Sequence, residues 1–147
     1  MTAMETERYT LDDKGVLTIK DDVTLIKGEE FKGRTDIKTV ILPGTVDSVG
    51  QSAFAGCKSL REIVLSEGVR WIWENAFRSC YKLKKIQIPA SLEHICSYAF
   101  AYCTGLKKAV VPSKTWIDNH VFDGCDVLEK VIIRDVKPIK LFFTAKG

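Results

Sequence analysis

Hydrophobic positions recur along this chain at a fixed interval. Phe77, Cys80, Leu83, Ile86 and Ile88 form one copy of a five-position pattern. The pattern also occurs 23 residues earlier, 23 residues later and after a further 22, with a degenerate copy upstream: Phe54, Cys57, Leu60, Ile63 and Leu65; Phe100, Cys103, Leu106, Ala109 and Val111; Phe122, Cys125, Leu128, Val131 and Ile133; Phe31, Arg34, Ile37, Val40 and Leu42. A unit this short cannot bury its own apolar face, so neighbouring units must stack. The pattern predicts a solenoid.

Alternation of apolar and polar residues within each repeat predicts the local structure. The motif L-x-x-I-x-L ends in a period of two, which is typical of a short strand. We expect these strands to stack in parallel over six turns, near residues 17–19, 40–42, 63–65, 86–88, 109–111 and 131–133. A second apolar pair, such as Val69 and Ile72, predicts a short return strand on the far side. The phrase A-F-x-x-C is expected to form a tight helical turn with its phenylalanine and cysteine pointing inward.

The two ends depart from the repeat and predict caps on a single domain that covers residues 1–147. Two β-type runs, Tyr9–Leu11 and Val16–Ile19, flank a polar turn that ends in Gly15, which is a hairpin signal. We therefore expect a hairpin cap over residues 8–19, stacked repeats over 20–133 and a closing cap over 134–147. Caps of this kind cover the exposed ends of repeat proteins.

Composition narrows the class of protein. With 46% hydrophobic residues, a net charge of +3 and a pI near 8.6, the chain suits a folded domain and gives no strong signal for nucleic acid or membrane surfaces. No apolar run approaches the ~20 residues of a spanning helix, and the first ten residues lack the apolar core of a secretory signal. Four of the five cysteines fall on the repeat, which indicates small buried residues. We expect no cofactor and no metal site, because zinc knuckles place cysteines two to four residues apart.

One segment, N-A-F-R-S-C-Y-K-L-K-K-I-Q-I-P-A-S-L-E-H-I, resembles the leucine-rich repeat superfamily, specifically the bacterial surface-antigen type called BspA-like. The resemblance extends from residue 17 to about residue 139. It implies a right-handed curved solenoid with its long parallel sheet on the concave face. It also implies a non-enzymatic role in adhesion or protein recognition, at the cell surface or after secretion.

Outward positions of the predicted sheet form columns that suggest a protein interface. The central column is mostly apolar, and its binding candidates are Ile41, Val64, Gln87, Val110 and Ile132. The column beside it is mostly charged, and its binding candidates are Thr39, Glu62, Lys85, Lys108 and Lys130. An aliphatic strip rimmed by charge is typical of a protein-binding surface. Two alternatives remain open. The β-branched residues could serve only to form strands and the lysines only to keep the surface soluble, or the lysines could form a ladder that binds a polyanion.

Aromatic residues gather on the predicted return strands. Trp71, His94 and Trp116 occupy the same position in successive turns, and Trp73 lies on the same face as Trp71. Outward tryptophans stack on sugar rings or act as hot spots for a partner. We therefore keep glycan binding and formation of a homodimer as alternatives, beside partial burial under a neighbouring loop.

Cys96 is the best candidate for a catalytic nucleophile. It is off the buried cysteine column, so we expect it to be exposed and reactive, with His94 two residues away and Asp118 in the next turn. A working thiol needs a histidine within hydrogen-bonding reach and an oxyanion site in a shaped pocket. An open strand surface offers neither, so the sequence predicts a protein that is not an enzyme.

Overall fold

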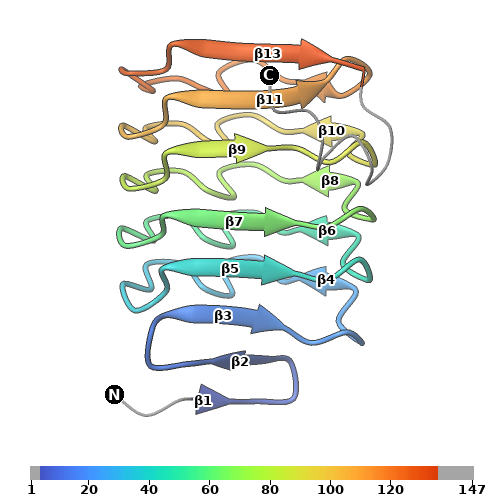
Figure 1. Cartoon of the computed structure of the whole chain (residues 1–147), viewed down its shortest axis with the longest axis vertical. Helices are drawn as coiled ribbons and strands as arrows, with labels where there is room; N and C mark the ends of the chain where they lie inside the picture. Colours follow the sequence, from blue (N-terminus) through green and yellow to red (C-terminus); the bar gives the residue numbers. More distant parts are fainter. Residues whose placement is uncertain (1–3, 136–147) are drawn as a thin grey trace.

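The computed structural model describes residues 4–135 and shows a β-solenoid (Figure 1). One series of strands forms what we call the long-strand face: β3 (Val16–Ile19), β5 (Thr39–Leu42), β7 (Glu62–Leu65), β9 (Lys85–Gln87), β11 (Lys108–Pro112) and β13 (Lys130–Arg134). The other series forms the short-strand face: β4 (Leu25–Ile26), β6 (Ser48–Val49), β8 (Trp71–Ile72), β10 (His94–Ile95) and β12 (Trp116–Ile117). The strands lie where the alternation predicts them.

A three-stranded antiparallel unit begins the described chain. β1 (Met4–Glu5), which the sequence analysis did not predict, pairs with β2 (Tyr9–Leu11), and β2 pairs with β3. The turn between β2 and β3 forms because one oxygen of Asp12 accepts hydrogen bonds from the backbone of Lys14 and Val16, each at 2.9 Å. β3 then pairs in parallel with β5, so it belongs to both the hairpin and the solenoid.

Buried columns of identical residues hold the turns together. The rings of Phe31, Phe54, Phe77 and Phe100 are almost fully buried and stack with centroids 5.2–5.3 Å apart. Each repeat cysteine donates its S–H to a phenylalanine carbonyl of the preceding turn, as Cys80 does to Phe54 at 3.3 Å. The predicted inward register of the phenylalanines and cysteines is therefore correct.

The expectation of helical turns is wrong, since residues 4–135 contain no helix. In each A-F-x-x-C phrase, the residue just before the alanine and the fourth residue of the phrase are left-handed, as Asn75 (φ 59°) and Ser79 (φ 62°) show. An α-helix needs negative φ at every residue, so the phrase folds as two consecutive turns. Its backbone also bonds between repeats, because the N–H of Phe77 donates to the carbonyl of Ala99 at 2.7 Å.

The six longer strands stack in order as predicted, but their hydrogen-bonded ladder is interrupted once. Hydrogen-bonded pairing on the long-strand face stops between β7 and β9, which separates the order β1-β2-β3-β5-β7 from β9-β11-β13. The short-strand face stays continuous from β4 to β12. In the corner that follows β7 and β9, the carboxylate of Glu67 accepts hydrogen bonds from the backbone N–H groups of Ala90 (3.1 Å) and Ser91 (3.0 Å). A side chain therefore joins these two turns at the corner.

Among residues 4–135, no helix is long and apolar enough to span a membrane.

The left-handed corners can be tested with two opposite substitutions. A methyl group on Gly56 (φ 71°) would have space, since its nearest neighbour is the Cα of Gly33 at 3.8 Å, so Gly56→Ala should cost only the backbone strain, about 1–2 kcal/mol. Ser79 holds the equivalent position in the next turn, and Ser79→Gly should unfold at an equal or higher urea concentration than the wild type. Ser79→Ala keeps the strain and is the control. A Gly56→Ala chain as stable as the wild type would contradict this account.

Candidate functional site

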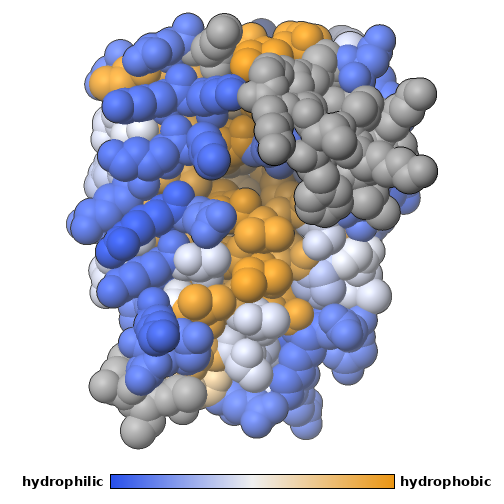
Figure 2. Space-filling model, in the orientation of Figure 1, coloured by the Kyte–Doolittle hydropathy of each residue, from blue (hydrophilic) through white to orange (hydrophobic). Residues whose placement is uncertain are grey.

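The long-strand face brings the predicted binding columns together. The register aligns Thr18 with Ile41 and Ile41 with Val64, and, beyond the break, Gln87 with Val110 and Val110 with Ile132. The flanking column follows the same register, with Thr39 opposite Glu62 in one sheet, and Lys85, Lys108 and Lys130 aligned in the other. Figure 2 shows an apolar strip running along this face with hydrophilic side chains on its left side.

Exposure varies along the central column. Val64 is 41% exposed, Gln87 is exposed, and Ile41 and Ile132 are half-buried. Val110 is only 9% exposed, so the expectation that alternation points it outward into solvent is wrong. Its strand neighbours Ala109, Val111 and Pro112 are buried as well, so both faces of β11 are covered at this point. In the flanking column Glu62, Lys85 and Lys108 are exposed, and Thr39 is half-buried.

The predicted aromatic residues form one cluster on the short-strand face, which we call the tryptophan cluster: Trp71, Trp73, His94 and Trp116. Trp71 stacks on Trp73 at 4.9 Å between ring centroids and lies 4.8 Å from His94, while Trp116 meets His94 edge-on at 6.5 Å. Trp116 is 66% exposed and Trp73 is 40% exposed, whereas Trp71 and His94 are half-buried. The cluster therefore combines a packed centre with two solvent-facing rings.

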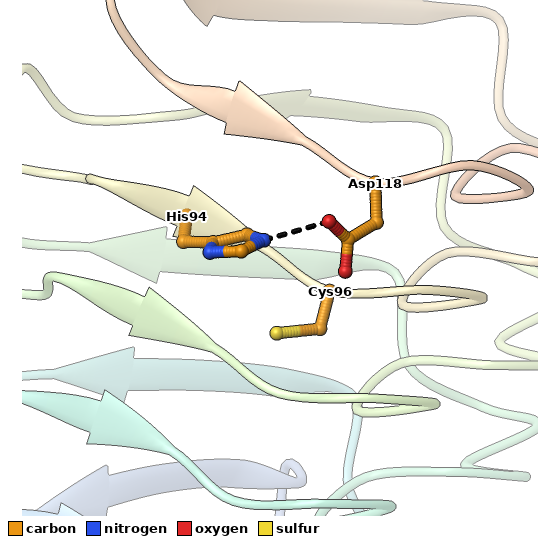
Figure 3. Close-up of side chains that lie close together, drawn as sticks. All are labelled: His94, Cys96 and Asp118. Carbon is orange, nitrogen blue, oxygen red and sulfur yellow. Dashed lines mark hydrogen bonds and ion pairs between the residues drawn. The ribbon is translucent and has the colours of Figure 1, made fainter.

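His94, Cys96 and Asp118 meet beside this cluster (Figure 3). Nε2 of His94 lies 2.8 Å from Oδ1 of Asp118, and the three side chains bring their potential ligand atoms within 4.8 Å of one another. The indole N–H of Trp116 also donates to Oδ1 of Asp118, at 3.0 Å. The hydrogen bond from His94 lowers the pKa of the Asp118 carboxyl, and Trp116 adds to this effect.

The expectation that Cys96 is exposed and reactive is wrong. Its side chain is 5% exposed, because the strand register places it between Trp73 and Asp118 of the two neighbouring turns. Burial, with smaller contributions from the nearby carboxylates of Asp118 and Glu74, raises the pKa of the Cys96 thiol to about 11.

Two features argue against a thiol nucleophile at this place. The available nitrogen of His94 pairs with a carboxylate and not with the thiol, and the raised pKa leaves almost no thiolate at neutral pH. A group of soft and charged donors that converges on one point is instead suited to hold a cation. His94, Cys96 and Asp118 are the residues that could supply its ligands.

A second aromatic group was missed by the sequence analysis. The guanidinium of Arg78 lies over the rings of Tyr98 (5.4 Å) and Tyr102 (4.9 Å), and His120 stacks on Tyr98 at 5.2 Å. Tyr98 and His120 share one left-handed corner position in successive turns. Their spacing of 22 residues, which equals the last repeat interval, is the signal for this pair in the sequence.

Native thiol reactivity should follow burial and pKa. Cys57, Cys80 and Cys103 are buried, and burial raises the pKa of each thiol, to about 11 for Cys57 and about 12 for Cys103. Cys125 is half-buried, so we expect it to be alkylated first, with Cys96 as slow as the other three. Mass spectrometry of the alkylation time course measures this, with Cys125→Ser as the control. Fast labelling of Cys96 in the folded wild type would contradict the structure.

Comparison with known proteins identifies the repeat. The profile of the BspA type leucine rich repeat region matches residues 16–141 in six copies. A search of curated proteins finds no match. A leucine rich cell surface protein from Faecalibacterium prausnitzii is similar in structure, with 28% identity and a TM-score of 0.79 over 84% of this chain. A leucine rich repeat protein of T. pallidum has 29% identity and a TM-score of 0.74, also over 84% of this chain.

A leucine-rich repeat protein from Eubacterium ventriosum, at 21% identity and a TM-score of 0.71 over 87% of this chain and 42% of its own, shares the fold. The present chain covers 33% of the F. prausnitzii protein and 67% of the T. pallidum protein. It therefore corresponds to a third of the former and about two thirds of the latter. With six consecutive repeats matched over most of its length, the chain belongs to the BspA type leucine rich repeat family.

Proposed function

We propose that this chain is a non-enzymatic protein-binding module whose interface is the long-strand face. The observation that carries the proposal is an apolar strip that stays exposed on a folded sheet, with Val64 at 41% exposure. Members of leucine-rich repeat families generally act in protein interaction, which agrees with this assignment. The name of the F. prausnitzii protein mentions the cell surface, which supports adhesion as the setting of the interaction.

The charges beside the strip fit a protein partner better than a polyanion. Glu62 in the third turn and Lys85 and Lys108 in the next two give a rim of both signs. Rims of this kind steer association and set its salt dependence, while the desolvated apolar centre holds the complex. A polyanion would gain little from Ile41 and Val64, because phosphate and sulfate groups bind through charge.

The strip is tested by placing a charge in its centre. Val64→Glu should leave the thermal transition close to that of the wild type, because the side chain is exposed. It should weaken binding to a protein found in an array screen by about 1–3 kcal/mol, measured by surface plasmon resonance. Val127→Glu is the matched control, since Val127 is a valine of similar exposure (42%) outside this face. Equal losses in the two variants, or none in Val64→Glu, would move the interface elsewhere.

A second candidate function is glycan binding by the tryptophan cluster. The specific observation is that Trp116 and Trp73 expose 66% and 40% of their surface next to a stacked ring pair. Flat indole faces stack well on the apolar faces of sugars, and such rings are costly to leave wet. The same surface would also suit a second copy of this chain.

Removal of the exposed rings tests both glycan binding and association with a second copy of the chain. Trp73→Ala with Trp116→Ala should fold normally and lose about 1–3 kcal/mol of glycan affinity on an array, or dissociate a wild-type dimer in analytical ultracentrifugation. Tyr81→Ala is the matched control, because Tyr81 is a 43% exposed aromatic residue outside the cluster. A wild type that is monomeric and binds no glycan would refute this candidate function.

A further inference from the structure

We propose that His94, Cys96 and Asp118 form a zinc-binding site on the short-strand face, at the junction of β10 and β12. The site is independent of the protein interface proposed above, which lies on the other face, so either proposal can fail alone.

The geometry needs little adjustment to hold an ion. The three potential ligand atoms lie within 4.8 Å of one another, and Nε2 of His94 is 2.8 Å from Oδ1 of Asp118. Ligands at the usual 2.0–2.3 Å from a tetrahedral zinc ion are about 3.5 Å apart. Figure 3 shows the Cys96 sulfur directed beneath the imidazole, on the side toward which Asp118 projects. A shift of about an ångström in side-chain position would therefore complete the ligand set.

The donors favour zinc over the common hard cations. A thiolate, an imidazole and a carboxylate together suit zinc, whereas magnesium and calcium prefer oxygen donors alone. Three protein ligands leave a fourth position for water or an external ligand. The half-buried His94 and Asp118 give that position access to solvent.

The backbone and a neighbouring indole hold these ligands in place. Cys96 donates its N–H to the carbonyl of Ile72 at 2.9 Å, and Asp118 donates to Ile95 at 3.0 Å, so both residues follow a paired strand directly. The indole N–H of Trp116 bonds to the carboxylate of Asp118 at 3.0 Å. Hydrogen bonds from outside the ligand set orient metal ligands and increase their affinity.

Local charge also favours a cation. Without one, Asp118 and Glu74 add to the burial that keeps the Cys96 thiol protonated. A zinc ion would take the place of the proton between His94 and Asp118, and it would stabilise the thiolate directly.

The chain contains a natural comparison for this site. Its other histidine, His120, pairs with Asp123 at the same 2.8 Å distance. Both of those side chains are more exposed than the His94 pair, at 55% and 45% against 24% and 29%. Within residues 4–135, a third potential ligand joins only the His94 pair. The two pairs therefore distinguish a convergent site from a simple hydrogen bond.

Titration of the reduced, folded chain with Co²⁺ and then Zn²⁺ tests the proposal. Co²⁺ should produce a thiolate-to-cobalt charge-transfer band with strong visible bands typical of tetrahedral geometry, and Zn²⁺ should displace it. All three tryptophans lie in the adjoining cluster, so Co²⁺ should also quench the intrinsic fluorescence. Absence of a thiolate band in the wild type would overturn the proposal.

Substitutions assign the ligands. Cys96→Ser should abolish the charge-transfer band, and Asp118→Asn and His94→Gln should each weaken zinc binding at least about tenfold, since loss of an outer hydrogen-bond partner alone costs about that much. His120→Gln and Cys125→Ser are matched controls and should bind as the wild type does. A band that persists in Cys96→Ser would refute the site. If that variant does not fold, Asp118→Asn decides, because its side chain is half-exposed and wild-type affinity there would equally refute it.

Discussion

The buried phenylalanine of each repeat stacks on the phenylalanines of the neighbouring turns, and the whole solenoid depends on this contact between turns. The rings of Phe54 and Phe77 lie 5.3 Å apart and nearly parallel, close to the spacing of adjacent strands. The corner backbone also forms hydrogen bonds to the next turn. For example, the N–H of Phe54 donates to the carbonyl of Ala76 at 2.8 Å. Packing and hydrogen bonding therefore impose one common rise per turn.

That common rise explains which parts of the fold could be predicted from the sequence. Inward positions must repeat, so the five-position pattern located the strands and the buried phenylalanines and cysteines. Corner conformation does not leave such a regular trace. Glycine occupies the second left-handed position at Gly33, Gly56 and Gly124, but Ser79 and Tyr102 occupy it in the turns between. Because a side chain at that position hides the signal, the corners were wrongly predicted to be helical.

The candidate site shows a different limit of sequence reasoning. Alternation correctly placed Trp71, His94 and Trp116 in one column, because this depends only on register. Exposure depends on what the adjacent turns place beside a residue. Cys96 lies between a tryptophan and an aspartate and is buried, whereas Val64 lies between Ile41 and the unpaired edge of β7 and stays exposed. Cysteine spacing alone likewise could not reveal a ligand set drawn from two turns.

The repeat also separates positions that maintain the fold from positions that are free to change. An inward substitution disturbs the packing of two neighbouring turns, so inward columns keep apolar residues in nearly every turn. Outward columns carry no such constraint, and their departures from uniformity therefore need another explanation. Such departures coincide on the short-strand face, where a histidine, a buried cysteine outside the cysteine column, an aspartate and three tryptophans adjoin. Packing within a solenoid requires none of these residues there, which is why this face, and not the regular core, carries information about a ligand.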